Sequence, residues 1–292
     1  MTARWALVAA LAACDAPMET TDAGVDGSTG PDAPPGCTRP SLDATWLEPQ
    51  LTSWITGMTT APRATTTQRT AARTYLMNQL ATIGWPAQLH TYTTGANVYA
   101  TIPATMGSGD EILVGAHFDT VTNSPGANDN ASGVAVVLAV ARYLVDVPCR
   151  TAPVTIVLFD GEENGLLGSR AYAPTKTAAN IRAVHTIDQV AWDQDNDLRF
   201  ELELPTTGLE AEYRAAAQVV GAQLTTTITQ GTDHEAFRER GFDAIGLTEE
   251  YVGGDTSPYR HTPQDTSATV DTPYLVLAAK LTAQVLISEV AP

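Results

Sequence analysis

Short apolar runs that alternate with longer helical patterns constrain the fold of this chain more than any other feature. Strand-type runs are predicted over Gln88–Tyr92, Asn97–Ile102, Glu111–His117, Val154–Phe159, Ile181–Ile187, Arg199–Leu204, Thr225–Thr229 and Ala244–Thr248. Helical patterns are predicted over Leu42–Met58, Gln68–Ile83, Ser132–Val145, Leu209–Val220, Asp233–Arg240 and Pro273–Glu289, with another helix from near Leu166. This alternation predicts an α/β fold in which helices cover both faces of a mostly parallel, twisted sheet.

The N-terminal segment differs in composition from the rest of the chain. Arg4 precedes an apolar run from Trp5 to Ala13, which is too short to span a bilayer but suits an export signal. The run ends in Leu-Ala-Ala-Cys14, which resembles a bacterial lipobox and implies that Cys14 is lipid-modified; the alternative is a poor leader with a chance cysteine. We therefore expect a signal peptide at 1–13, an acidic flexible tether at 14–37 and one domain at 38–292.

Charge and cysteine usage narrow the class of protein. The 33 acidic and 16 basic residues give a net charge of −17, which argues against nucleic-acid binding and fits an exported protein, either a bacterial envelope lipoprotein or a secreted one. Contact with a membrane is expected only through the lipid on Cys14. The two remaining cysteines, Cys37 and Cys149, are either a disulfide or two unpaired thiols.

Metal-binding side chains recur where the predicted strands end, which is where functional groups gather in open α/β sheets. The residues concerned are His117, Asp119, Asp129, Glu162, Glu163, Asp188 and His261. Any one of them could be a helix cap or a satisfied polar group, but the set repeats at successive strand ends. Two imidazoles with several carboxylates favour Zn²⁺ over Ca²⁺ or Mg²⁺, which prefer oxygen ligands, so the sequence predicts a zinc site.

The same residues carry a resemblance to a known family. "HFD" at 117–119, "GANDNASG" at 126–133, "DGEENGLLGS" at 160–169, Asp188, "GTDHEAF" at 231–237 and "YRHTPQDT" at 259–266 occur in the order found in M28 zinc aminopeptidases. The resemblance is close over Glu111 to Thr266. It implies the zinc exopeptidase (phosphorylase/hydrolase-like) fold, a mixed sheet between helices, and a pair of zinc ions.

Carried over residue by residue, the resemblance implies a ligand set. His117 and Asp188 would bind one zinc ion, and Glu163 and His261 the other. Asp129 would bridge both ions and precede a cis peptide to Asn130. Asp119, two residues along the strand from His117, would hydrogen-bond that imidazole and fix its tautomer.

Glu162 is the carboxylate that this assignment leaves free. It would take a proton from the attacking water and pass it to the leaving amine, as general base and then general acid. The substrate's free α-amine would meet the metal centre and nearby carboxylates, which predicts an aminopeptidase acting on peptide or protein N-termini.

Several features and two alternatives stay open. His234 fits the family pattern without an evident task, Arg260 stands where relatives often carry an aromatic residue, and Glu249 and Glu250 are structural or face the substrate's amine. The first alternative is a glutaminyl cyclase-like enzyme with a single zinc. The second is a surface-binding lipoprotein on the same fold without catalytic activity.

Overall fold

The computed structural model describes residues 34–107 and 109–292. The expected signal peptide, Cys14 and most of the tether lie outside these residues. An eight-stranded mixed sheet forms the centre of the fold, in the order β1-β2-β4-β3-β5-β8-β6-β7. Its strands are β1 (Gln88–Tyr92), β2 (Gly95–Ile102), β3 (Glu111–His117), β4 (Val154–Phe159), β5 (Ile181–Ile187), β6 (Arg199–Glu203), β7 (Gln223–Thr227) and β8 (Ala244–Thr248).

The four central strands, β4, β3, β5 and β8, are mutually parallel, whereas β2 and β6 run antiparallel to their neighbours β4 and β8. The residues of β4 are buried along its whole length, as expected for a strand covered on both faces. Because the four strands are parallel, their carboxyl ends meet at one edge of the sheet, and the loops that follow them can converge there.

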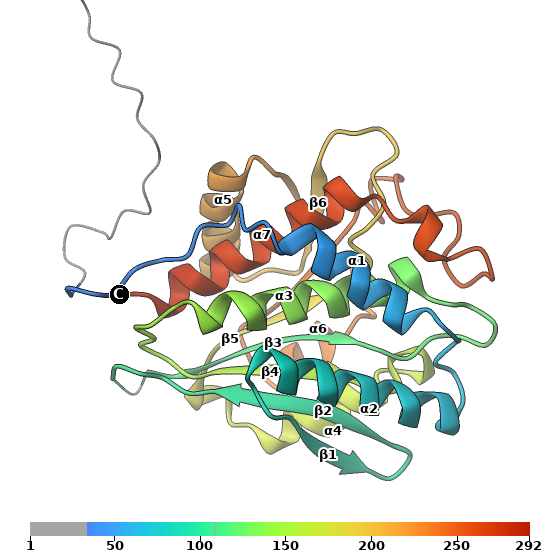
Figure 1. Cartoon of the computed structure of the whole chain (residues 1–292), viewed down its shortest axis with the longest axis horizontal. Helices are drawn as coiled ribbons and strands as arrows, with labels where there is room; N and C mark the ends of the chain where they lie inside the picture. The colour runs from blue at the N-terminus through green and yellow to red at the C-terminus, as the bar shows by residue number, and fades with distance from the viewer. Residues whose placement is uncertain (1–33, 108) are drawn as a thin grey trace, which may run out of the picture.

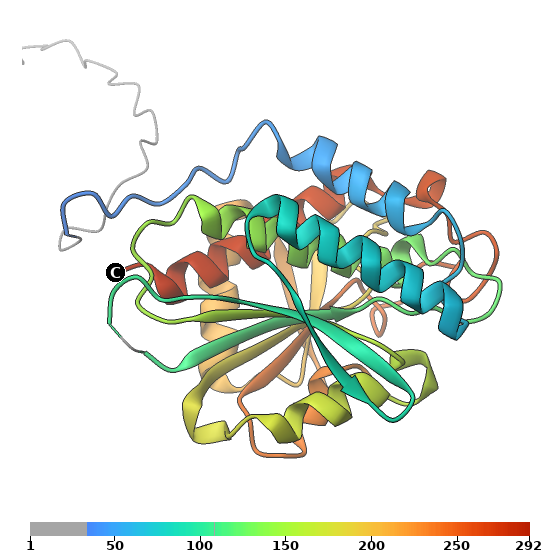
Figure 2. The same cartoon turned by 60° about the horizontal axis from the view of Figure 1, so that its bottom comes forward.

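Helices cover both faces of the sheet (Figures 1 and 2). One face carries α1 (Leu47–Met58), α2 (Thr66–Ile83), α3 (Gly133–Val145), α5 (Thr207–Val220) and α7 (Thr272–Val290), and the other carries α4 (Leu167–Tyr172) and α6 (His234–Arg238). Side chains alternate between the two cores along β3: Ile112 and Val114 join the larger one, and Leu113 joins the smaller one. The predicted fold class, a mixed sheet between helices, is confirmed.

Helix α1 and strand β7 depart most from their predicted bounds, whereas the other predicted elements agree to within two residues at either end. The first helix begins at Leu47 instead of Leu42, which places Pro49 in its first turn, where the missing N–H has no helical partner to lose. A helix from Leu42 would have put that proline in its interior, where it breaks the hydrogen-bond ladder. Strand β7 spans Gln223–Thr227 instead of Thr225–Thr229, because its parallel pairing with β6 sets Gln223 opposite Arg199.

Two further features stabilise the domain. Cys37 and Cys149 form a disulfide that ties the start of the described chain to the loop after α3, which decides between the two possibilities left by the sequence.

Helix α7 is long and apolar enough to cross a membrane by length and composition, but 67% of its most apolar window is buried. It packs against α3 and α5, so it is a core helix of this domain.

Candidate metal centre

The seven predicted site residues come from loops at the carboxyl edge of the four parallel strands. His117 ends β3, Glu163 lies in the turn after β4, and Asp188 directly follows β5. Asp129 belongs to the loop between β3 and α3, and His261 to the loop between β8 and α7. The parallel topology is therefore what brings residues up to 144 positions apart in sequence, from His117 to His261, to one edge.

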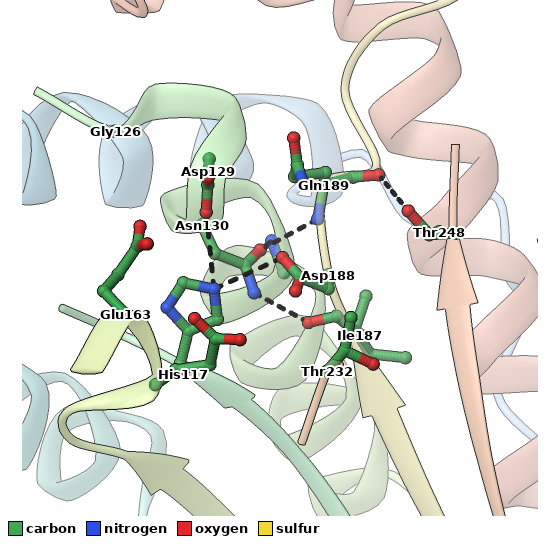
Figure 3. A network of polar contacts seen from close by, with 12 residues as sticks. His117, Gly126, Asp129, Asn130, Glu163, Ile187, Asp188, Gln189, Thr232 and Thr248 are labelled. Carbon is green, nitrogen blue, oxygen red and sulfur yellow. Dashed lines mark hydrogen bonds and ion pairs between the residues drawn. The ribbon is translucent and has the colours of Figure 1, made fainter. Parts of the chain in front are cut away.

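These side chains form two groups that share Asp129. In the first, His117 Nε2 lies 3.3 Å from Asp129 Oδ1 and 3.3 Å from Asp188 Oδ1 (Figure 3). In the second, His261 Nε2 lies 3.1 Å from Asp129 Oδ2 and 3.0 Å from Glu163 Oε2. The two carboxylate oxygens of Asp129 thus face two different imidazoles.

The distances and the chemistry of the donors fit metal ions. Two ligands bound about 2.0 Å from a tetrahedral zinc ion are about 3.3 Å apart, which matches the spacing in both groups. Asp129 Oδ2 and Glu163 Oε1 are also buried without a hydrogen-bond donor among the described residues. Buried carboxylate oxygens without partners are costly unless a cation compensates them, so both groups have the composition and geometry of cation sites.

The backbone around Asp129 is held by side chains that the sequence analysis did not single out. The Asp265 carboxylate accepts hydrogen bonds from the N–H groups of Asn128 and Asp129, at 2.8 and 3.0 Å. Asn130 donates to the Ile187 carbonyl at 2.8 Å, which links this loop to the end of β5 (Figure 3). The peptide bond from Asp129 to Asn130 is cis, as the family resemblance implied.

Asp119 lies next to His117, as predicted, and has a second set of partners. Its Oδ1 is 3.6 Å from His117 Nδ1, and the imidazole is also 3.3 Å from the Asp119 carbonyl. The same carboxylate accepts hydrogen bonds from the backbone N–H groups of Glu162 and Glu163, at 3.0 and 3.3 Å. It therefore connects the end of β3 to the turn after β4.

Arg63 is a buried cation close to the site, and no pattern in the sequence singles it out. Its guanidinium donates to four backbone carbonyls, including those of Phe118, Pro125 and Gly126 in the segment between His117 and Asp129. Burial lowers the pKa of Arg63 to about 10, and the nearby carboxylates of Asp119 and Asp265 oppose that shift. It remains a cation at neutral pH and fixes the loop that presents Asp129.

Glu162 does not belong to either group of ligands. Its side chain lines a cavity of about 90 Å³ beside Asp129 and Asp188, at the edge of the site. Burial raises the pKa of Glu162 to about 9, assisted by the Asp188 carboxylate and opposed by His117. Such a carboxyl can hold a proton and release it when a cation binds nearby.

The glutamates after β8 have two different places in the structure. Glu249 is fully buried and accepts hydrogen bonds from Asn128, Thr256 and Ser257, at 2.8 to 2.9 Å. It braces the loop that carries His261 against the loop that carries Asp129. Glu250 lies 3.3 Å from Arg199 and points away from the centre, so neither glutamate lines the cavity.

The comparison with protein families decides what kind of domain this is. A model of peptidase family M28 matches residues 97–286, about two thirds of the chain. The chain belongs to peptidase family M28. The match includes every residue of the two groups and the turn with Glu162.

Curated relatives of this M28 chain include named aminopeptidases. Aminopeptidase YwaD of Bacillus subtilis is 33% identical over 169 residues, which cover 53% of this chain and 36% of the relative. The probable lipoprotein aminopeptidase LpqL of Mycobacterium tuberculosis is 28% identical over 185 residues, which cover 57% and 36%. The chain therefore matches about a third of the length of these relatives.

Solved structures confirm the zinc exopeptidase fold of the M28 chain. The zinc aminopeptidase BSAP from Bacillus subtilis aligns with a TM-score of 0.63 and 27% identity, over 67% of this chain and 50% of that one. A Porphyromonas gingivalis glutaminyl cyclase aligns with a TM-score of 0.72 and 20% identity, over 83% and 98%. The fold is thus common to peptidases and cyclases, and only the site can separate them.

Proposed function

We propose that this domain is an aminopeptidase that uses two zinc ions. The observation that carries the proposal is the position of Asp129 between His117 and His261, with one carboxylate oxygen facing each imidazole. A carboxylate shared in this way suits a bridge between two cations. A site for one ion would leave one of the two imidazoles without a role.

His117 and Asp188 would hold one ion, Glu163 and His261 the other, and Asp129 would contact both. Nitrogen and carboxylate donors of this kind suit zinc, and the zinc aminopeptidase BSAP has a similar fold. Bound zinc would supply Lewis acidity, which acidifies the attacking water and polarises the scissile carbonyl. Asp119 would keep the His117 imidazole in the tautomer that leaves Nε2 free for binding.

Glu162 would move the protons. Its carboxylate would accept one from the attacking water and deliver it to the amine of the departing peptide. Bound cations would lower its pKa from the value of about 9 that burial produces here, and so prepare it to act as a base near neutral pH. Its place beside Asp129 and Asp188 puts it in reach of a water at the centre.

The same proposal covers substrate and location. The substrate would be the N-terminus of a peptide or protein, since an α-ammonium group suits a site surrounded by carboxylates. We also propose that the protein is exported, and is either anchored in the bacterial envelope through Cys14 or secreted. The probable lipoprotein aminopeptidase among its relatives supports this proposal. Residues 14–37 would be the tether and 38–292 the peptidase domain.

A glutaminyl cyclase-like enzyme with one zinc is the second candidate, because a cyclase shares the fold closely. The presence of two complete ligand groups favours the two-zinc reading. A binding protein without activity is less favoured still, since the ligands, Asp119 and Glu162 are all in place.

The test is hydrolysis by the full chain of a panel of aminoacyl p-nitroanilides and peptide amides, with metal analysis before and after chelation. Release of the first residue that is lost with chelator and restored by zinc, at two equivalents per chain, supports the proposal. One equivalent of zinc together with cyclisation of N-terminal glutamine would instead establish the cyclase. Absence of chelator-sensitive release from every substrate would overturn the aminopeptidase proposal.

A further inference from the structure

A polar cavity leads away from the metal centre, past the end of β8 and toward β6. It begins at Asp188 after β5, passes Thr248 at the end of β8 and reaches Glu203 at the end of β6. Among the described residues that line it, Tyr251 is the one aromatic side chain, and no aliphatic side chain is present. Such walls favour a ligand group that forms hydrogen bonds over an aliphatic one.

Glu203 is a buried carboxyl on the wall of this cavity, with 1% of its surface exposed. Its Oε2 accepts a hydrogen bond from the Thr232 hydroxyl at 2.7 Å. Since that hydroxyl has one proton and gives it to Glu203, it accepts from His234 Nδ1, which lies 2.7 Å away. The neutral chain from His234 through Thr232 therefore orients the carboxyl of Glu203.

No lysine or arginine side chain pairs with Glu203 within residues 34–107 and 109–292. Burial raises the pKa of Glu203 to about 8, with Asp188 and Glu201 adding to the shift, although the bond from Thr232 opposes it. Burial also lowers the pKa of His234 to about 4, so the imidazole brings no positive charge. The carboxyl therefore lacks a countercharge while the cavity is empty.

Gln189 offers a second acceptor on the same wall. The residue is 6% exposed, and its Oε1 is buried without a hydrogen-bond donor in the described part of the chain. Figure 3 shows Gln189 next to Asp188, with its backbone carbonyl facing Thr248, and the residue lines the cavity. Gln189 thus adds a buried acceptor without a donor to the cavity that Glu203 lines, and a buried acceptor left unpaired is costly.

The backbone of β8 is shaped to accommodate Glu203. A Cβ atom at Gly246 would collide with Glu203 Oε2 and come within 3.0 Å of His234 Nδ1. Because Gly246 has no side chain, the Glu203 carboxyl can lie close to the backbone of β8, beside its Thr232 donor. The position of Glu203 is therefore supported from both β8 and the segment before α6.

We propose that this cavity receives the side chain of the substrate's first residue and selects a cationic one, with Glu203 as the specificity-determining residue. An ammonium group has three hydrogens, no acceptor and a positive charge, so it can donate to the Glu203 carboxylate and supply the countercharge that this carboxylate lacks. Arg260 is the one cationic side chain among the described residues that line the cavity. It lies 3.4 Å from Asp129, at the end of the cavity next to the metal centre. This inference rests on the proposed aminopeptidase function.

Lysine and norleucine carry the same four-carbon side chain and differ by the ammonium group at the end of the lysine chain, so the comparison isolates the effect of that charged group. The full-length zinc-loaded protein is assayed for kcat/KM on lysyl, norleucyl and alanyl p-nitroanilide. We expect lysine to exceed norleucine by about tenfold or more, the usual contribution of a hydrogen bond to a charged group. Glu203→Gln should abolish that preference and lower lysine turnover far more than alanine turnover, and Glu250→Gln, a neighbouring charge outside the cavity, should preserve the preference.

Equal rates for lysine and norleucine, or a preference that survives Glu203→Gln, would overturn the inference. Loss of alanine turnover in Glu203→Gln would indicate a disturbed fold, and Thr232→Val, which removes the donor to Glu203 and the acceptor for His234, then takes its place. If no reporter is cleaved, calorimetry measures how tightly lysinamide and norleucinamide bind. If no reporter is cleaved but lysinamide binds more tightly, the activity proposal is wrong and the cavity assignment stands; equal binding rejects both.

Discussion

The carboxylate of Asp119 accepts a hydrogen bond from the backbone N–H of Glu162, with Oδ1 3.0 Å from the nitrogen. The same oxygen lies 3.6 Å from His117 Nδ1, and the other accepts from the Glu163 N–H at 3.3 Å. One fully buried carboxylate therefore sets the relation between an imidazole at the end of β3 and the two glutamates after β4. Neither group can shift without losing a partner on the other strand.

Asp119→Asn tests this relation with almost no change of shape. The amide can accept at one position only, so either a backbone N–H or the imidazole loses its partner. We expect zinc affinity and kcat/KM to fall by about 10- to 100-fold, as is usual when a residue that orients a metal ligand is replaced. Competition with a fluorescent chelator measures the affinity. Asp146→Asn, an exposed residue that pairs with Arg142, is the control, and equal values in both variants would contradict a positioning role.

The adjacent glutamates should respond differently to the same substitution. Glu162→Gln removes the proposed base and should lower kcat by about 100- to 10,000-fold while both zinc ions stay bound. Glu163→Gln removes an oxygen that lies 3.0 Å from His261 Nε2 and should lower the zinc content. Elemental analysis beside steady-state rates distinguishes the two. If Glu162→Gln kept peptide hydrolysis intact, the proposed mechanism would be wrong.

The parts of this site that the sequence could predict are those that recur at strand ends. His117 ends one apolar run, Asp188 directly follows another and Glu163 lies in the turn after a third, and the parallel sheet then brings them together. The strand bounds of β3, β4, β5 and β8 were predicted to the residue, because apolar runs buried on both faces end where the chain reaches water. Helix α1 was extended too far, because its apolar pattern continues before Pro49 without continuing as a helix.

The missed residues act on backbone groups or across strands that are distant in sequence. Arg63 lies just before α2, and nothing near it in the sequence shows that four carbonyls surround its side chain. Glu203 ends a short strand whose place beside β8 follows from the sheet order alone. Asp265 is within a recognised segment, and Glu249 is singled out with its role left open between structural and amine-facing, since the partners of both lie on the distant loop of Asp129. Side-chain patterns do not encode such long-range contacts.

Arg63→Met should destabilise the domain strongly. Methionine fills similar space but leaves the carbonyls of Met58, Phe118, Pro125 and Gly126 without this donor. We expect the free energy of unfolding to fall by about 3 kcal/mol or more, in the range for a broken buried polar network. Urea unfolding of the chelated protein measures it.

The matched control for that experiment is Arg214→Met, which removes an exposed arginine paired with Glu210 on α5. An exposed pair within one helix contributes about 0.5 kcal/mol or less. Arg63→Met should also weaken zinc binding, because the freed loop carries Asp129. If the free energy of unfolding fell by no more in Arg63→Met than in Arg214→Met, water would replace the guanidinium at little cost and the prediction would be wrong.

His234 should make stability depend on pH in a defined direction. Burial lowers its pKa to about 4, whereas the unfolded chain protonates near the ordinary value of about 6.5. The neutral imidazole therefore contributes stability that is fully present above pH 6.5 and is lost as the pH falls through 4, up to about 3 kcal/mol. Asparagine can still donate to Thr232 but does not titrate, so His234→Asn should lose less stability over this range. Urea unfolding of both chelated proteins at several pH values measures the difference, in which the titration of His117 and His261 cancels. Parallel curves would mean that the folded protein holds His234 protonated, for which a charged Glu203 3.4 Å from its Nδ1 would be the partner.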